Sequence, residues 1–157
     1  MGRSALIHRE KVRHNLEESY THLRRLDQAL DALRRVQDFP IDRQRYQEIV
    51  DRGETLAYSD QVIYRFSKLQ DCMGAKLFRS LLAYQGENTD RPFLDLLNRL
   101  EQMGVLRVEE WYMMRDLRNE IAHNYDDDEE TVVNILNTIE SLSDDLHTIL
   151  DEVSRLL

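Results

Sequence analysis

Four side chains with site chemistry fall within eight residues late in the chain: Arg118, Asn119, His123 and Tyr125. A guanidinium presents a planar set of donors that matches a phosphate group. An imidazole can accept and donate a proton near neutral pH. Together, Arg118 and His123 could cleave a phosphodiester with the ribose 2′-hydroxyl as the nucleophile, and that reaction requires RNA.

These residues lie in a segment that we expect to be helical from about residue 108 to residue 124. Apolar residues recur there at helical spacing, and no Gly or Pro interrupts it. Asn119 and His123 are one turn apart and share a face, with Arg118 beside it. Tyr125 joins the same pocket only if the helix ends near residue 124, or if a neighbouring molecule supplies the other wall.

The spacing by itself has a second interpretation. Arg-x4-His occurs three times, at Arg3–His8, Arg9–His14 and Arg118–His123, and only the third has Asn after the Arg and a Tyr two residues after the His. A helix end with an Arg–carboxylate pair and a surface His would also explain it.

Residues 118–125, with the pattern R-N-x-x-A-H-x-Y, resemble the R-x4-H-x-Y signature of HEPN-domain proteins. The length and helical order of most of the chain are similar to HepT-type ribonuclease toxins, which pair with a minimal nucleotidyltransferase antitoxin. The resemblance implies a homodimer in which Arg118 and His123 of two protomers form one metal-independent ribonuclease site, with Asn119 as a polar support. It implies that the partner uses ATP to adenylylate Tyr125 and so silences the toxin, which itself needs no cofactor.

Composition limits the functional classes. A chain of 157 residues fits one domain, residues 1–157, around a single core. The formal net charge of −9 argues against a broad nonspecific nucleic-acid binder, so an RNase requires a locally positive cleft. No 18-residue apolar run and no signal peptide is visible, which predicts a cytoplasmic protein without a membrane segment.

We expect an all-α, up-and-down bundle of about five to six helices, HEPN-like and dimeric. Only five Gly and two Pro occur, and apolar residues recur at three- and four-residue steps. The expected helices cover residues 8–37, 42–51, 55–85 (as one helix or two), 90–103, 108–124 and 129–155. We expect Gly53 to end the second helix, Thr89 or Asp90 to cap the fourth, and Gly104 to end it. The lone Cys72 is expected to be buried.

Several features of these helices bear on function. The apolar stripe of the last helix is expected in the core and could extend into a dimer seam. Gly74 is expected to mark a kink or a close helix contact. Four basic residues of the third helix either contact phosphate at a cleft or form solvated salt bridges: Arg65, Lys68, Lys76 and Arg79. The acidic run 126–130 is expected to favour the start of the last helix, and it lacks the spacing of a calcium loop.

Three functions remain open at the level of sequence. The first is the ribonuclease toxin, with transfer RNA as one candidate substrate. The second is a non-catalytic subunit of a nucleotidyltransferase that holds a nucleotide or substrate against Arg118 and His123. The third is a helical interaction protein in which both residues are structural. The sequence shows no glycine-rich phosphate loop, no Cys/His metal cluster and no Gly-x-Ser-x-Gly elbow, which removes the commonest enzyme classes.

Overall fold

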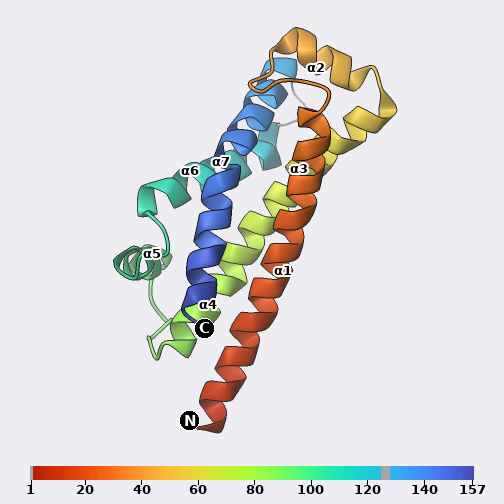
Figure 1. The fold of residues 1–157 in the computed structure, drawn as a ribbon. Coiled ribbons are helices and arrows are strands. Elements are labelled where there is room, and N and C mark those ends of the chain that lie inside the picture. The colour runs from red at the N-terminus through yellow and green to blue at the C-terminus, as the bar shows by residue number, and fades with distance from the viewer. Residues whose placement is uncertain (1, 125–127) are drawn as a thin grey trace.

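The computed structural model describes residues 2–124 and 128–157, and all regular secondary structure in these residues is helical (Figure 1). The elements in chain order are α1 (Arg3–Arg34), α2 (Arg43–Val50), α3 (Gly53–Cys72), the π-helical turn η1 (Met73–Leu77), α4 (Phe78–Tyr84), α5 (Phe93–Gln102), α6 (Val108–Asn124) and α7 (Glu129–Arg155). Because α3, η1 and α4 follow one another without a break, the described residues form six helical segments. The expected all-α bundle of about five to six helices is confirmed.

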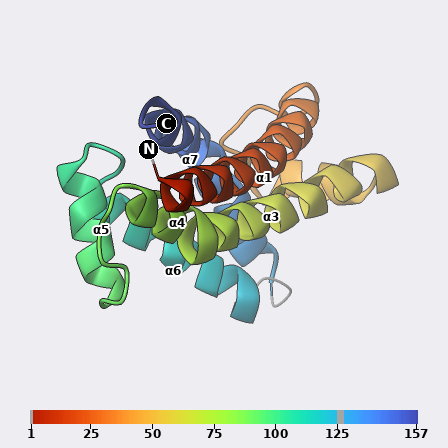
Figure 2. The ribbon, with the colours of Figure 1, turned by 90° about the horizontal axis from the view of Figure 1, so that it is seen from below.

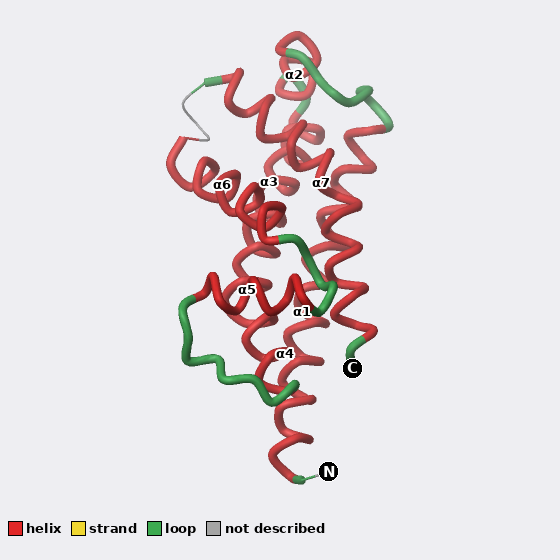
Figure 3. Tube along the Cα trace, turned by 90° about the vertical axis from the view of Figure 1, so that its left-hand side faces the viewer, coloured by secondary structure: helices red, strands yellow, loops and turns green. Residues whose placement is uncertain are grey.

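The long helices alternate in direction. In Figure 1, α1 runs up the molecule, α3 through α4 runs down beside it, α6 rises obliquely and α7 descends. The most extensive contact joins α1 and α3, and α7 packs against both. Viewed along the bundle in Figure 2, α6 lies on the opposite side of α3 from α1, and α5 lies beside α4. Figure 3 shows α5 and α6 crossing the long helices. One side of α6 is exposed to solvent.

The apolar stripe of α7 is used entirely within one chain. Its buried residues recur at three- and four-residue steps and are Val132, Ile135, Leu136, Ile139, Leu142, Leu146, Ile149, Leu150 and Val153. The core of the same molecule covers this stripe, so its expected place in the core is confirmed. Its extension into a dimer seam stays a prediction. The large exposed apolar side chains of α3 and α6 are Tyr64, Tyr112 and Met113.

Most helix ends follow the sequence signals. The Asp128 side chain accepts a hydrogen bond of 2.7 Å from the Thr131 backbone N–H and caps α7. Gly104 follows α5 with a φ of 78°, a left-handed conformation that favours glycine. The limits of α6 and α7 coincide with the expected 108–124 and 129–155.

Three helix ends differ from those predicted from the sequence. Helix α1 already begins at Arg3. Gly53 begins α3 instead of ending α2, because Arg52 is extended and its carbonyl accepts the first helical hydrogen bond, from the Leu56 N–H. Pro92 occupies the N-cap position of α5, and the Asp90 N–H instead bonds the Asn88 side chain in a tight turn.

The sequence predicts a chain without a membrane-spanning helix, which would have to be both long and apolar. None of the described helices combines the length and the apolarity needed to cross a bilayer.

Candidate functional site

A groove of about 450 Å³ lies between α6 and the segment formed by the end of α3, η1 and α4. Its α6 wall carries Trp111, Arg115 and Arg118, which share a stripe because they recur at i, i+4 and i+7. Asn119 extends this wall. The remaining lining residues come from α3, η1, α4 and α5: Gln70, Asp71, Gly74, Ala75, Arg79 and Phe93.

Trp111 sets the distance between the two walls. Its side chain is only 1% exposed, and it makes edge-on ring contacts with Phe78 at 5.0 Å and Phe93 at 6.2 Å between centroids. A Cβ atom built on Gly74 would lie 3.0 Å from the Trp111 ring. The expected close helix contact at Gly74 is therefore confirmed, and it falls within the π-helical turn η1.

Arg118 is held in a two-point ion pair with Asp71. Nε donates to Oδ1 at 2.9 Å, and the Nη2 group donates to Oδ2 at 3.0 Å. Hydrogen bonding to this carboxylate, helped by its charge, raises the pKa of Arg118 above its ordinary value. Asp71 therefore fixes the orientation of the guanidinium, while Nη1 makes no hydrogen bond to any described residue.

Two further arginines border the groove. The guanidinium carbons of Arg79 and Arg115 each lie 6.0 Å from the centroid of the Phe93 ring. Arg79 also donates from Nη1 to the Thr89 carbonyl at 2.8 Å. With three arginines and one aspartate among its lining residues, the groove has a net positive charge in a chain of net charge −9. The sequence-based requirement for a locally positive cleft is met here.

The other basic residues expected at a cleft lie elsewhere. Arg65 contacts the His22 ring nitrogen at 3.0 Å, and Lys76 pairs with Glu18 at 3.2 Å. Lys68 lies over the Tyr64 ring, 5.6 Å from its centroid. Of the four, only Arg79 lines the groove.

The groove gathers only part of the motif. Arg118 and Asn119 line it, whereas His123 is exposed and does not. In a regular helix, five residues separate two side chains by roughly 140° and about 7.5 Å of rise. His123 therefore lies one turn beyond the groove-lining Asn119, on a different side of α6 from Arg118. Tyr125, the expected modification site, lies outside the described residues.

Sequence reasoning missed Asp71, the residue in closest contact with the motif. It precedes Arg118 by 47 residues and belongs to a different helix. No periodicity within either helix relates two positions so far apart, and only the packing of α6 on α3 brings them together. Gln70 and Phe93 enter the groove in the same way. Cys72 is buried, as expected.

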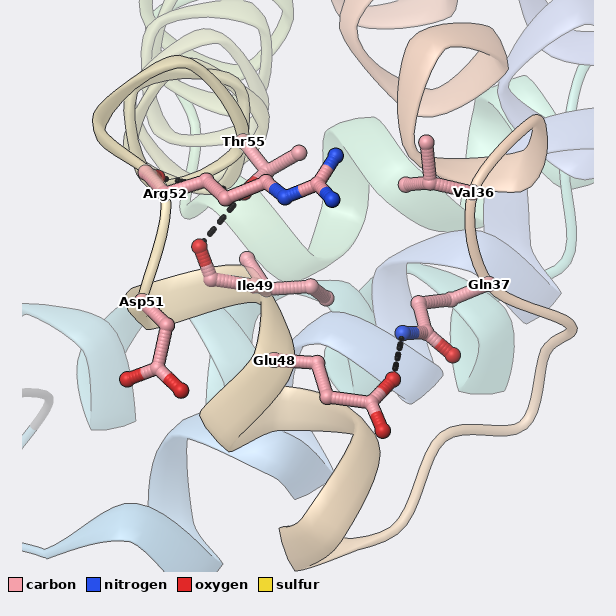
Figure 4. Close-up of a pocket in the computed structure, with 7 residues that line it drawn as sticks. All are labelled: Val36, Gln37, Glu48, Ile49, Asp51, Arg52 and Thr55. Atoms are coloured by element: carbon pink, nitrogen blue, oxygen red, sulfur yellow. Dashed lines mark hydrogen bonds between the residues drawn. The ribbon is translucent and has the colours of Figure 1, made fainter.

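A second cavity, of about 410 Å³, lies where α1, α2 and α3 meet (Figure 4). Two hydrogen bonds join its lining residues: the Gln37 amide donates to Glu48 at 2.5 Å, and the Thr55 hydroxyl donates to the Ile49 carbonyl at 2.5 Å. Arg52 is its one lining arginine. This cavity lacks the motif residues and the clustered charge of the groove, so the groove is the stronger candidate site.

No family model, curated protein sequence or solved structure matches the chain. Within residues 2–124 and 128–157, no three His, Cys, Asp or Glu side chains are grouped so that they could hold a metal ion. The features of this chain that bear on function are therefore the motif and the groove beside it.

Replacing Asp71 with asparagine tests whether the ion pair positions Arg118. Both side chains are partly exposed, so we expect the free energy of unfolding to fall by less than about 1 kcal/mol. For the ribonuclease that the motif leads us to expect, cleavage of RNA should fall about tenfold, mainly through kcat, because a loosened guanidinium would stabilise the transition state less well. Steady-state cleavage kinetics on a labelled RNA would measure this.

A matched control is Asp31→Asn, which breaks another exposed Asp–Arg pair, with Arg34 at 3.0 Å on α1. It is expected to leave cleavage unchanged. A rise in activity for Asp71→Asn would instead mean that the Asp71 carboxylate competes with the phosphate for Arg118.

Proposed function

We propose that the protein is a metal-independent endoribonuclease toxin of the HEPN type. The observation that carries the proposal is the meeting of the motif residues Arg118 and Asn119 with Arg79 and Arg115 in one positively charged groove of an acidic protein. Phosphodiester recognition needs such a local excess of positive charge. The surface His123, one turn beyond Asn119, supplies a group that can transfer protons.

The proposed reaction is an internal transfer to phosphorus. His123 accepts the proton of the ribose 2′-hydroxyl, whose oxygen attacks the adjacent phosphorus, and the bond to the 5′-oxygen breaks. An imidazolium returns a proton to the leaving 5′-oxygen. Arg118 binds the nonbridging oxygens and stabilises the charge that develops on them. The products are a 2′,3′-cyclic phosphate end and a 5′-hydroxyl end.

A homodimer would complete this site. His123 and Arg118 of one chain diverge along α6, so a second copy would have to bring its own imidazole to the groove. The solvent-facing side of α6 carries Tyr112, 39% exposed, and Met113, 56% exposed, and these apolar side chains would be covered by such a contact. A twofold axis beside α6 would place the same surface of both chains in contact.

The test of the ribonuclease is direct. Purified protein without any partner should cut a labelled transfer RNA or an unstructured RNA in the presence of EDTA. Mass spectrometry of the fragments should show 2′,3′-cyclic phosphate ends. Intact RNA after prolonged incubation at micromolar protein, with no growth arrest on expression, would refute the catalytic proposal.

Modification of Tyr125 is the second part of the proposal. A partner nucleotidyltransferase would transfer AMP from ATP to the Tyr125 hydroxyl, with release of pyrophosphate, and so block RNA cleavage. We expect intact mass to increase by one or more AMP units after incubation with ATP and the partner, and we expect Tyr125→Phe to abolish the increase. Tyr112→Phe, at an exposed tyrosine of α6, is the control. An increase that persists in Tyr125→Phe would exclude this residue as the acceptor.

Two observations favour a second function, a non-catalytic nucleotide-binding subunit of a nucleotidyltransferase. Arg118 already has a carboxylate partner in Asp71, and His123 lies outside the groove of its own chain. Such a subunit would bind a nucleotide in the groove without cutting RNA. The nuclease assay on unmodified protein separates the two functions.

A further inference from the structure

Arg115 has unused hydrogen-bonding capacity in the groove. Its guanidinium carries five N–H donors. Its contact among the described residues is with the Phe93 ring, and it forms no hydrogen bond or ion pair with any of them. A charged group with free donors at the wall of a groove is suited to an anionic ligand, because a bound anion would satisfy both the charge and the donors.

Arg79 faces the same groove from α4 and is held in place. One of its donors bonds the Thr89 carbonyl at 2.8 Å, in the loop that leads to α5, and the same side chain lies over Phe93. Neither arginine belongs to the R-x4-H-x-Y motif. The two lie on opposite walls, one on α4 and one on α6, with the Phe93 ring within 6.0 Å of both guanidinium carbons.

Ala75 leaves the space between these walls open. It lies on η1, is exposed, and lines the groove between Asp71 and Arg79 at four-residue spacing. A large side chain there would project into the groove. The groove volume of about 450 Å³ lies within the range of small-ligand sites.

We propose that this groove is a backbone-binding subsite in which Arg79 and Arg115 hold phosphates of single-stranded RNA next to the phosphate held by Arg118. The inference rests on the proposed function for the identity of the ligand. Phe93 offers a partly exposed aromatic surface between the two arginines, on which an unpaired base can stack. The groove thereby selects a single strand and sets which phosphate reaches Arg118.

The test measures binding separately from cleavage. The full chain carrying His123→Ala, which blocks cleavage, is titrated into a fluorescein-labelled single-stranded RNA, and anisotropy is recorded at several salt concentrations. We expect Arg115→Gln and Arg79→Gln each to weaken binding about tenfold and to reduce the slope of log K against log salt by about one. Arg52→Gln, at the lone arginine of the second cavity, should change neither quantity.

A steric variant tests the groove without altering charge. Ala75→Leu should weaken RNA binding to a similar extent, while Ala57→Leu, at an exposed alanine of α3, should not. Circular dichroism melts of each variant confirm that the chain is folded. Unchanged affinity and salt slope in the folded Arg79, Arg115 and Ala75 variants would overturn the subsite.

The two proposals fail in different ways. A wild-type protein that binds RNA through Arg79 and Arg115 but never cuts it would refute the nuclease and leave the subsite standing. A wild-type protein that cuts RNA, with Arg79→Gln and Arg115→Gln variants that bind and cut as well, would refute the subsite and leave the nuclease standing.

Discussion

Alanine at His123 or at Arg118 is expected to lower the rate of RNA cleavage by at least about a hundredfold. Loss of the imidazole removes proton transfer at both the attacking and the leaving oxygen, a contribution of roughly 10²–10⁴. Loss of the guanidinium removes stabilisation of the charge that develops on phosphorus, worth several kcal/mol in comparable sites. Single-turnover cleavage of a labelled RNA measures either loss without interference from product release.

The chain contains matched controls for this experiment. Arg9 and His14 repeat the Arg-x4-His spacing on α1, and His14 is exposed there. Arg9→Ala and His14→Ala should leave cleavage unchanged if the chemistry belongs to the α6 motif alone. His123→Ala should also leave the melting temperature nearly unchanged, because its side chain is exposed and contacts no described residue through a hydrogen bond or ion pair. Full activity in folded His123→Ala would contradict the proposed mechanism.

Mixing the two inactive variants tests whether one site is built from two chains. In a heterodimer of Arg118→Ala with His123→Ala, the one shared site regains an intact arginine and an intact histidine, each from a different chain. Random exchange of subunits should therefore restore up to about half of the wild-type activity, since about half of the dimers are mixed. No recovery after denaturation and joint refolding would show that each chain carries a whole site or that no dimer forms.

Trp111→Ala is expected to destabilise the fold by about 3–5 kcal/mol, the usual cost of truncating a large buried aromatic residue. Trp111 is 1% exposed and joins η1, α4 and α5 to α6 through Gly74, Phe78 and Phe93. The free energy of unfolding of an ordinary domain is about 5–15 kcal/mol, so this loss would be a large fraction of it. Urea denaturation followed by circular dichroism is the appropriate measurement, because the substitution removes the only tryptophan.

Trp111→Phe separates ring packing from polar effects. The buried indole N–H has no acceptor among the described residues, so replacement by phenylalanine breaks no hydrogen bond. Trp111→Phe should therefore lower the free energy of unfolding clearly less than Trp111→Ala does. Tyr112→Ala, at the exposed neighbour, should change the free energy of unfolding by less than about 1 kcal/mol. A small effect of Trp111→Ala would mean that the walls of the groove are held apart by other contacts.

The sequence by itself determined the helices and most of their ends. Periodic apolar residues, a capping aspartate at position 128 and a glycine at position 104 act within a few residues of one another, so their effects are visible in the linear pattern. It also determined that Arg118, Asn119 and His123 lie on one helix and that Gly74 permits a close approach. Two of the three ends that it failed to predict, at Gly53 and Pro92, were decided by the backbone conformation of their neighbours, which has no unique residue signature.

Only the tertiary structure decided which motif residues share a groove and what surrounds them. Asp71 reaches Arg118 across 47 residues, and Arg79, Phe93 and Arg115 converge from three helices, because α6 packs obliquely on α3 while Trp111 fills the space over Gly74. The same packing leaves His123 outside the groove of its own chain. A helix specifies the angle between its own side chains, but the partners of those side chains depend on how helices dock, which is set by contacts distant in sequence.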